Sequence, residues 1–239
     1  MSSSKTAPVS TLKVLSAGAV KGGVAKLAAE FERATRTRVT VDYAPAPDVR
    51  DRITAGEAAD VVILAQAMMD EVAKQGKILP DSRALLGSSR MGVAVHAKAP
   101  TPDLSDTAAF KKLVQGATQV IYNKASSGLY AAKLLEKLGL KIGLGSKIVV
   151  VDSGAAIMET VAAQPPGAVG LAQMSEIMVL VDKGCAVKLA APLPDEIQNV
   201  TSYDAAATSA SKAPDDARAL ARQLTSDAAK KIFAATGIS

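Results

Sequence analysis

Near its start, the chain carries the run LKVLSAGAVKGG over residues 12–23. Leu12 to Ser16 is a short alternating run, which predicts a β-strand. The small residues after it, with Gly18, Gly22 and Gly23, predict a turn that opens a helix. Apolar side chains then recur at helical spacing, so we expect that helix over residues 24–34. The run therefore predicts a strand, a turn and a helix in direct succession.

The same succession repeats along the chain. Further strands are predicted at residues 39–43, 59–64, 90–96, 119–122, 147–151, 167–171, 187–190 and 200–207. Helices are expected after Asp48, over 68–75, from Ser105 to 114, and over 129–138, 155–163 and 214–235, with Asp48 and Ser105 as N-caps. Strands that alternate with helices indicate an α/β fold with a mainly parallel sheet.

The order of these elements predicts two lobes. We expect residues 11–86 and 195–239 to form lobe 1 and residues 87–194 to form lobe 2, with residues 1–10 as a disordered lead. The last strand and helix are too small for a domain of their own, so we expect them to return to lobe 1. The chain then crosses twice between the lobes, which makes a hinge beside a ligand cleft.

Composition narrows the possible ligands. Hydrophobic residues make up 49% of the 239 residues, but there is no Trp and only four Tyr and three Phe. Aromatic stacking platforms are therefore scarce, which disfavours sugars and single-stranded nucleic acids. The net charge of +5 favours an anionic ligand by long-range attraction. Basic and acidic residues are interspersed, so no nucleic-acid partner is expected.

The cysteine and histidine counts exclude disulfides and zinc clusters. Cys185 and His96 are the only residues of their types, so no internal disulfide or His/Cys zinc cluster can form, and no catalytic Cys–His pair is expected. We expect no metal and no cofactor. No run is apolar enough to span a membrane, and the first residues have no signal-peptide core. We therefore expect a monomer without membrane insertion, periplasmic if a signal peptide was removed and cytoplasmic otherwise.

Three predicted strand-to-helix junctions carry small and hydroxyl residues. They lie at Ser16, at residues 126–128 (Ser-Ser-Gly) and at residues 152–154 (Asp-Ser-Gly). Free N–H groups at a helix start bind anions, and ligands of open α/β sheets lie at the carboxyl ends of strands. Ser and Gly are also ordinary helix caps, so that interpretation stays open. The spacing of Gly18, Gly22 and Gly23 fits neither nucleotide-binding motif, and no Gly-x-Ser-x-Gly is present.

Several stretches carry a family resemblance. They are LKVLSAGAV from Leu12, LAAEFE from Leu27, Ile53-x-Ala-Gly56-x-x-Ala59-Asp60-Val-Val-Ile, Gly128-Leu-Tyr130-Ala, and LEKLG from Leu135. On these stretches the chain resembles the molybdate-binding-protein-like group of type II periplasmic binding proteins over about residues 12–239. The resemblance implies a two-lobed fold, a small anionic ligand, and the membrane component of an ABC transporter as partner.

The oxyanion ligands of that group do not carry over. Ala19 stands where molybdate binders have a hydroxyl, and Ala44-Pro-Ala46-Pro47 replaces a Gly-Ala-Ser-Gly loop. Leu171 stands where a tyrosine is frequent. Proline has no N–H to donate, so the second loop is a poorer oxyanion cradle. Molybdate and tungstate are therefore not the expected ligands.

A branch of this fold, the periplasmic aconitate isomerases, is similar at residues 126–130 (SSGLY) and 193–201 (LPDEIQNVT). That resemblance implies a di- or tricarboxylate ligand. Two hypotheses stay open: a carboxylate-binding solute-binding protein, and an isomerase that moves a proton, with Lys21 and Tyr130 as candidate catalytic residues. The expected ligand-binding residues are Ser16, Ala17, Ala19, Ala46, Leu64, Arg90, Ser126, Ser127, Gly128, Tyr130 and Ser153.

Overall fold

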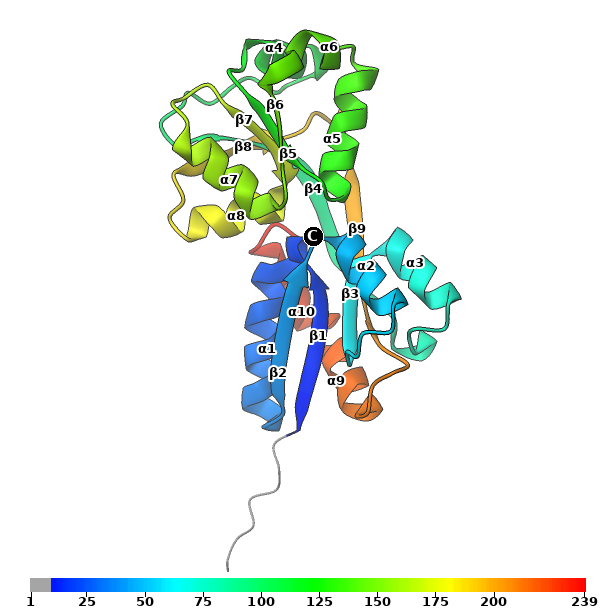
Figure 1. The fold of residues 1–239 in the computed structure, drawn as a ribbon. Coiled ribbons are helices and arrows are strands. Elements are labelled where there is room, and N and C mark those ends of the chain that lie inside the picture. Colours follow the sequence, from blue (N-terminus) through cyan, green and yellow to red (C-terminus); the bar gives the residue numbers. More distant parts are fainter. Residues whose placement is uncertain (1–9) are drawn as a thin grey trace, which may run out of the picture.

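The computed structural model describes residues 10–239, and most of the expected disordered lead therefore lies outside the described residues. The described chain forms two lobes placed end to end, joined at a narrow waist (Figure 1). The C-terminus lies at this waist, against lobe 1 (Figure 1). Between residues 10 and 239, no helix combines the length and the apolar character that a bilayer crossing needs.

Lobe 1 contains the first three strand–helix units and the C-terminal elements. They are β1 (Thr11–Ala17), η1 (Gly18–Val20), α1 (Lys21–Thr35), β2 (Arg38–Ala44), α2 (Ala46–Thr54), β3 (Val61–Ala65), α3 (Gln66–Lys74), η2 (Pro80–Ser82), β9 (Val200–Ala207), α9 (Pro214–Leu224) and α10 (Asp227–Ala234). β1 lies parallel to both β2 and β3, and β9 adds antiparallel to β3. The predicted parallel arrangement is therefore present, with one antiparallel strand beside it.

Lobe 2 repeats the plan. It contains α4 (Thr107–Gly116), β5 (Val120–Asn123), α5 (Ser126–Lys137), α6 (Lys141–Leu144), η3 (Gly145–Lys147), β6 (Ile148–Val151), α7 (Gly154–Ala163), β7 (Val169–Gln173), α8 (Met174–Asp182), β8 (Val187–Pro192) and η4 (Asp195–Ile197). β5 lies parallel to β6 and β7. Parallel neighbours bring the starts of α5 and α7 to the same edge of the sheet.

The strand β4 (Ala84–His96) links the two lobes. Its first half pairs antiparallel with β9, from Ala84 to Arg90, and its second half pairs with β7 and β8. The predicted strand over 90–96 is only this second half. One sheet therefore runs through both lobes in the order β2-β1-β3-β9-β4-β7-β5-β6.

Each lobe has its own apolar core. In lobe 1, Leu15 and Leu64 from the sheet pack with Phe233 from α10, and all three are almost fully buried. In lobe 2, Phe110 and Leu135 from the covering helices pack against β4, β5 and β7. Helices cover the strands of each lobe, and the apolar side chains of both form the core.

Local helix signals explain four differences from the predicted elements. The expected helix over 214–235 is two helices, since Ser226 caps α10 by accepting a hydrogen bond from the Ala229 N–H (3.2 Å). Asp106, and not Ser105, caps α4. Asp48 lies inside the first turn of α2, whose N-cap is Pro45. The helix α8 was not predicted.

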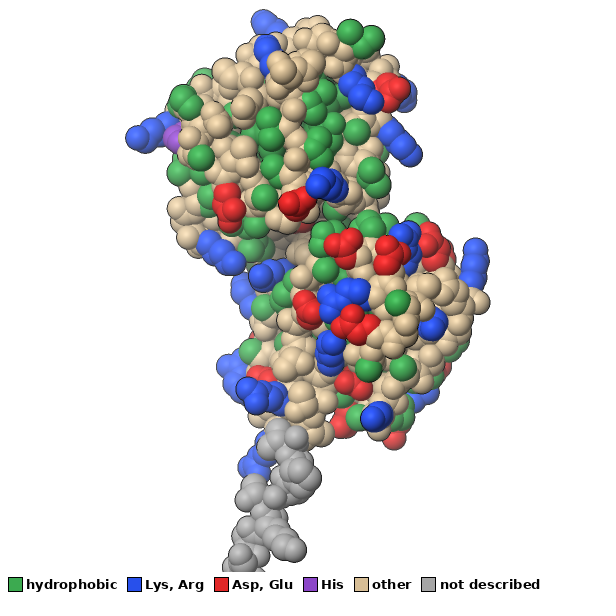
Figure 2. Space-filling model, in the orientation of Figure 1, with side chains coloured by type: hydrophobic (Ala, Val, Ile, Leu, Met, Phe, Trp, Pro, Cys, Tyr) green, Lys and Arg blue, Asp and Glu red, His purple; other side chains and the backbone are tan. Residues whose placement is uncertain are grey.

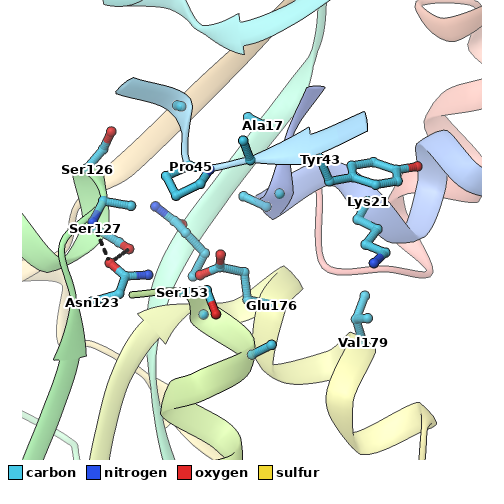
Figure 3. A pocket seen from close by; sticks show the side chains of 18 of the residues that line it. Ala17, Lys21, Tyr43, Pro45, Asn123, Ser126, Ser127, Ser153, Glu176 and Val179 are labelled. Atoms are coloured by element: carbon cyan, nitrogen blue, oxygen red, sulfur yellow. Dashed lines mark hydrogen bonds between the residues drawn. The ribbon is translucent and has the colours of Figure 1, made fainter. Parts of the chain in front are cut away.

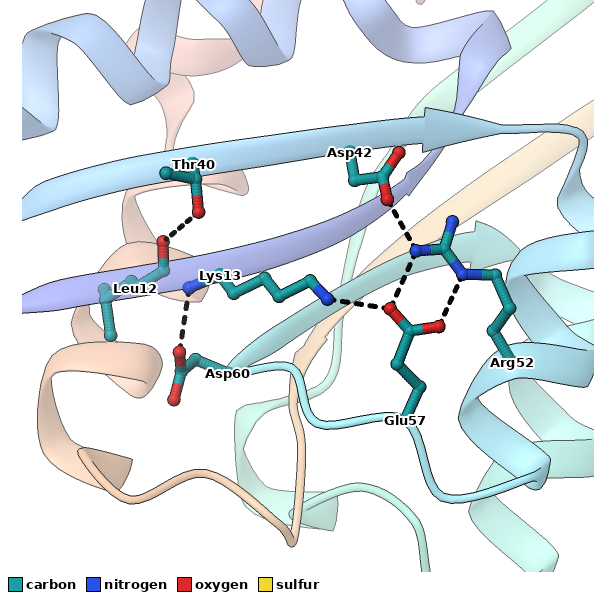
Figure 4. Close-up of polar contacts among 7 residues, drawn as sticks. All are labelled: Leu12, Lys13, Thr40, Asp42, Arg52, Glu57 and Asp60. Carbon is teal, nitrogen blue, oxygen red and sulfur yellow. Dashed lines mark hydrogen bonds and ion pairs between the residues drawn. The ribbon is translucent and has the colours of Figure 1, made fainter.

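Charged side chains join the strands of lobe 1 at its surface (Figure 4). Glu57 accepts hydrogen bonds from both Arg52 (2.7 Å) and Lys13 (2.7 Å), and Arg52 also contacts Asp42 (2.5 Å). These hydrogen bonds, with Arg52 as the larger cause, lower the pKa of Glu57 to about 2. The Lys13 backbone N–H donates to Asp60 (2.8 Å) just before β3, so the network ties β1 to the loop that precedes β3.

Candidate functional site

A cavity of about 380 Å³ lies between the lobes, at the carboxyl ends of their parallel strands. Lobe 1 contributes Ala17, Gly18, Ala19, Lys21, Tyr43, Ala44, Pro45, Ala46 and Tyr203. Lobe 2 contributes Asn123, Ala125, Ser126, Ser127, Ser153, Gly154, Ala155, Glu159, Gln173, Glu176, Val179, Leu180 and Lys183. The cavity therefore lies at the constriction between the two lobes that Figure 2 shows.

The start of α5 points donors into this cleft. The first helical hydrogen bond of α5 runs from the Leu129 N–H to the Ala125 carbonyl (2.9 Å), so the N–H groups of Ser126 and Ser127 precede it and lack a helical acceptor. The Ser126 hydroxyl is buried without a partner among the described residues. Ser127 instead donates to Asn123 Oδ1 (3.4 Å, Figure 3). This turn is built to receive a negatively charged group.

Other helices also begin at the cleft. Ser153 caps α7 by accepting from the Ala156 N–H (3.2 Å), which leaves the N–H groups of Gly154 and Ala155 at the cavity wall. In lobe 1, η1 and α2 start there as well, although Pro47 removes one donor from α2. The N-terminal ends of helices carry partial positive charge, so several of them around one cavity favour an anion with several negative groups.

Basic side chains add to this field. Lys21 and Lys183 line the cleft from opposite lobes. The Lys21 ammonium lies 5.0 Å from the centre of the Tyr43 ring, a cation–π contact visible in Figure 3. The Tyr43 hydroxyl is buried without a partner in the described chain, and burial raises its pKa to about 12. Tyr43 therefore stays protonated.

Two acidic side chains, Glu159 and Glu176, line this otherwise positive cleft. Glu176, in the first turn of α8, lies between Ser153 of lobe 2 and Ala17 of lobe 1 (Figure 3). Its Oε2 atom is buried and has no hydrogen-bond partner among residues 10–239. Burial raises the pKa of Glu176 to about 7, and a backbone hydrogen bond at Gln173 opposes this only in part. The carboxyl group is therefore poised to bind or release a proton near neutral pH.

A glycine makes room for this carboxyl group. A Cβ on Gly154 would lie 2.3–2.6 Å from the Glu176 carboxyl atoms, closer than real contacts allow. The carboxyl group thus rests directly on the first residue of α7. Burial raises the pKa of Tyr203, and the nearby Glu176 charge raises it further.

The lobes also touch beside the cleft. α8 of lobe 2 packs on η1 and the start of α1. A Cβ on Gly22 would lie 2.9 Å from Val179 Cγ2, so the glycine allows this close approach between the lobes. Val179 and Lys21 bound the same end of the cavity (Figure 3).

The structure brings seven of the predicted site residues to the cleft. Three come from lobe 2, namely Ser126, Ser127 and Ser153. Four come from lobe 1, namely Ala17, Ala19, Lys21 and Ala46. They meet because parallel strands end at one edge of each sheet and the two edges face each other.

Five other predicted residues do not line the cavity. The Ser16 hydroxyl is buried and donates to the Ala17 carbonyl (3.1 Å), and Leu64 lies in the core of lobe 1. Arg90 pairs with Asp195 outside the cleft. The Tyr130 hydroxyl donates to the Ile197 carbonyl (3.0 Å), and Gly128 is packed against Asn123. Ser16, Leu64 and Tyr130 therefore make contacts within the lobes, away from the cavity.

Sequence reasoning missed cleft residues that include Tyr43, Lys183, Gln173 and Glu176. Gln173 ends β7, Glu176 lies in α8, and Lys183 follows directly after α8, a helix that was not predicted. A signal was present: the apolar residues Ile177, Leu180 and Val181 follow the strand at helical spacing, with Glu176 in the first turn.

Glu176 makes the stability of the protein depend on pH. Its pKa rises from 4.5 to about 7 on folding, so the folded state holds the proton more tightly and loses stability as pH increases through this window. Between pH 4.5 and pH 8 we expect the wild type to lose roughly 3 kcal/mol of unfolding free energy through this group. The Glu176→Gln variant, which cannot titrate at this position, should not show this loss. Urea denaturation at both values measures this, and parallel pH profiles for the two proteins would contradict it.

Two lobes of α/β type, one shared sheet and a cleft at the strand ends define the type II periplasmic-binding-protein fold. Over residues 12–239 the sequence matches the family described as bacterial extracellular solute-binding protein. The chain belongs to this family, and the predicted fold and resemblance are confirmed.

Individual relatives agree with this assignment. An aconitate isomerase from Pseudomonas sp is 34% identical over 234 residues, which cover 94% of this chain and 86% of the relative. The periplasmic molybdate-binding protein of Azotobacter vinelandii shares the fold with a TM-score of 0.77 at 22% identity, covering 95% of this chain and 98% of that one. The sulfate-binding protein SubI of Mycobacterium tuberculosis H37Rv gives 0.76 at 16% identity, covering 96% and 86%.

Proposed function

We propose that this protein binds an unsaturated di- or tricarboxylate in its cleft and isomerises it by moving a proton, as an aconitate isomerase does. The observation that carries the ligand class is the convergence of several helix starts and two lysines on one cavity. Separate groups of donors at α5, α7 and η1 suit a ligand whose carboxylates are spread over several carbons.

The size of the cavity supports the same ligand class. About 380 Å³ accommodates a six-carbon tricarboxylate, whereas a tetrahedral oxyanion would fill only part of it. In addition, the alanines and prolines at Ala19 and Pro45–Pro47 supply fewer donors than a compact oxyanion shell needs.

The reaction class is supported by the relative. Its name is aconitate isomerase, and its 34% identity extends over almost the whole of both chains. The reaction requires that a proton leave a carbon next to the double bond and that the resulting negative charge be stabilised. N–H groups and lysines around the cleft provide that stabilisation for carboxylate oxygens.

A binder without turnover is the second candidate, because the family is one of solute-binding proteins. In that case the cleft would hold the same carboxylates for delivery, with an ABC transporter membrane component as partner and an extracytoplasmic location.

Two measurements test the proposal. We expect cis- and trans-aconitate to interconvert when the purified protein is added, followed by absorbance or proton NMR, and citrate to bind while molybdate and sulfate do not. Citrate binding without interconversion at high protein concentration would favour the binder. Nanomolar molybdate binding without carboxylate binding would refute the carboxylate ligand class.

A further inference from the structure

The cleft contains a carboxyl group that ligand binding does not explain. An ionised acidic side chain repels a bound polycarboxylate, because like charges repel, so a carboxyl group among the donors needs an explanation of its own. Glu176 nevertheless lines the cavity, and its Oε2 atom is buried with no partner within the described chain. A buried unpaired carboxyl oxygen is costly, and at a functional site such a cost points to a role in the chemistry.

We propose that the Glu176 carboxyl group carries the proton in the isomerisation, an inference that rests on the proposed function. The Glu176 carboxylate takes a proton from the methylene carbon next to the double bond, and the electron pair of that C–H bond becomes the new carbon–carbon double bond. The former π pair moves to the far carbon, which receives the proton back from Glu176. The number of electrons is unchanged, so no oxidant or reductant is needed.

The surroundings of Glu176 suit a group that both takes and returns a proton. Its pKa of about 7 lets both protonation states exist at neutral pH. It faces Gly154 of α7 and the buried Tyr203 of β9, and no basic partner neutralises its Oε2 in the described structure. The neighbouring N–H groups at the start of α7 would hold the substrate carboxylate on which negative charge builds up.

The candidate residues from the sequence suit this role less well. The Tyr130 hydroxyl donates to the Ile197 carbonyl and does not line the cavity. Lys21 lies in the cleft with its ammonium over the Tyr43 ring, where a charged lysine attracts the ligand.

Gly154 is a positioning residue in this scheme. Its backbone conformation is one that alanine can adopt, so Gly154→Ala adds a methyl group that must displace the Glu176 carboxyl group. We expect kcat to fall about 100-fold although the carboxyl group is retained, because a shift of about 1 Å is enough for such a loss.

The test compares turnover with binding. We expect Glu176→Gln to lower kcat for aconitate by about 10²- to 10⁴-fold. Binding of the saturated analogue tricarballylate should stay equal or become tighter, which also shows that the variant is folded. In D₂O, a Glu176 proton that exchanges with solvent before its return places deuterium in the aconitate methylene group, so the wild type should show this label and the variant should not. Glu136→Gln, which changes an exposed glutamate of the same lobe, is the control and should match the wild type.

The outcomes separate the two proposals. If the wild type interconverts aconitate and Glu176→Gln does so at the same rate, Glu176 does not carry the proton and the proposed function stands. If the wild type neither interconverts aconitate nor exchanges deuterium, the proposed function fails and the role of Glu176 fails with it.

Discussion

Gly128→Ala is expected to destabilise the protein by roughly 3 kcal/mol or more, at the upper end for overpacking. A Cβ at this position would lie 1.6 Å from the backbone carbonyl oxygen of Asn123 and 2.5 Å from its carbon. No change of side-chain rotamer can relieve a clash between a Cβ and the backbone, so α5 must move away from the end of β5. The donors of Ser126 and Ser127 move with it, and citrate affinity should fall as well.

Urea denaturation measures the loss of stability, and Gly116→Ala is the matched control. Gly116 also lies in a helix of lobe 2, but a Cβ there meets no atom within 4 Å. The control should therefore be neutral or slightly stabilising, as expected for glycine replaced by alanine at a compatible position. Equal stability of Gly128→Ala and the wild type would show that α5 does not pack on Asn123 as described.

Arg83→Met is the second large effect, with an expected loss of about 3–5 kcal/mol. The side chain of Asp204 is only 4% exposed, and Arg83 Nε donates to it (2.7 Å). Gln66 supplies a second hydrogen bond (3.0 Å), but an amide does not neutralise a charge. Removing Arg83 would leave the buried carboxylate of Asp204 unpaired, at the point where β9 meets β3.

Two further variants isolate this effect by the same denaturation measurement. Arg218 is as exposed as Arg83 (27% and 26%), but its partner Asp81 is 63% exposed. Arg218→Met should therefore cost no more than about 1 kcal/mol. Adding Asp204→Asn to Arg83→Met should recover part of the stability, because the unpaired charge is then removed. A loss for Arg83→Met no larger than for Arg218→Met would disprove the role of burial.

The sequence was informative about the fold because several strands, such as β3 and β7, are short and fully buried. Residues of β3, for example, are all buried, and short apolar runs between helical patterns identify such strands. The ends of helices were harder to predict from the sequence. The break between α9 and α10, for example, depends on the single hydroxyl of Ser226, which caps α10 where one continuous helix was expected. α8 was missed because its apolar stripe directly follows an apolar strand.

The candidate site could be predicted only where local sequence determines it. Ser126 and Ser153 lie at helix starts, and a strand followed by small hydroxyl residues signals such a start. The environment of Glu176 is tertiary: its burial depends on Gly154 and on the opposite lobe, which are distant in sequence. The sequence does not reveal the register of β4, which determines where the Arg90 side chain points on this strand between the lobes.

The position of β9 has a consequence for synthesis of the chain. β9 pairs with β3 in the sheet of lobe 1, and Gln66 bonds to Asp204 across 138 residues of sequence. The strands β5, β6 and β7 all leave the ribosome before β9 does. Until then β3 has an unpaired edge and the apolar face that α9 and α10 cover is open to water. We therefore expect the earlier-begun lobe to be completed last, so its half-made sheet is the part of the nascent chain that most needs protection from aggregation.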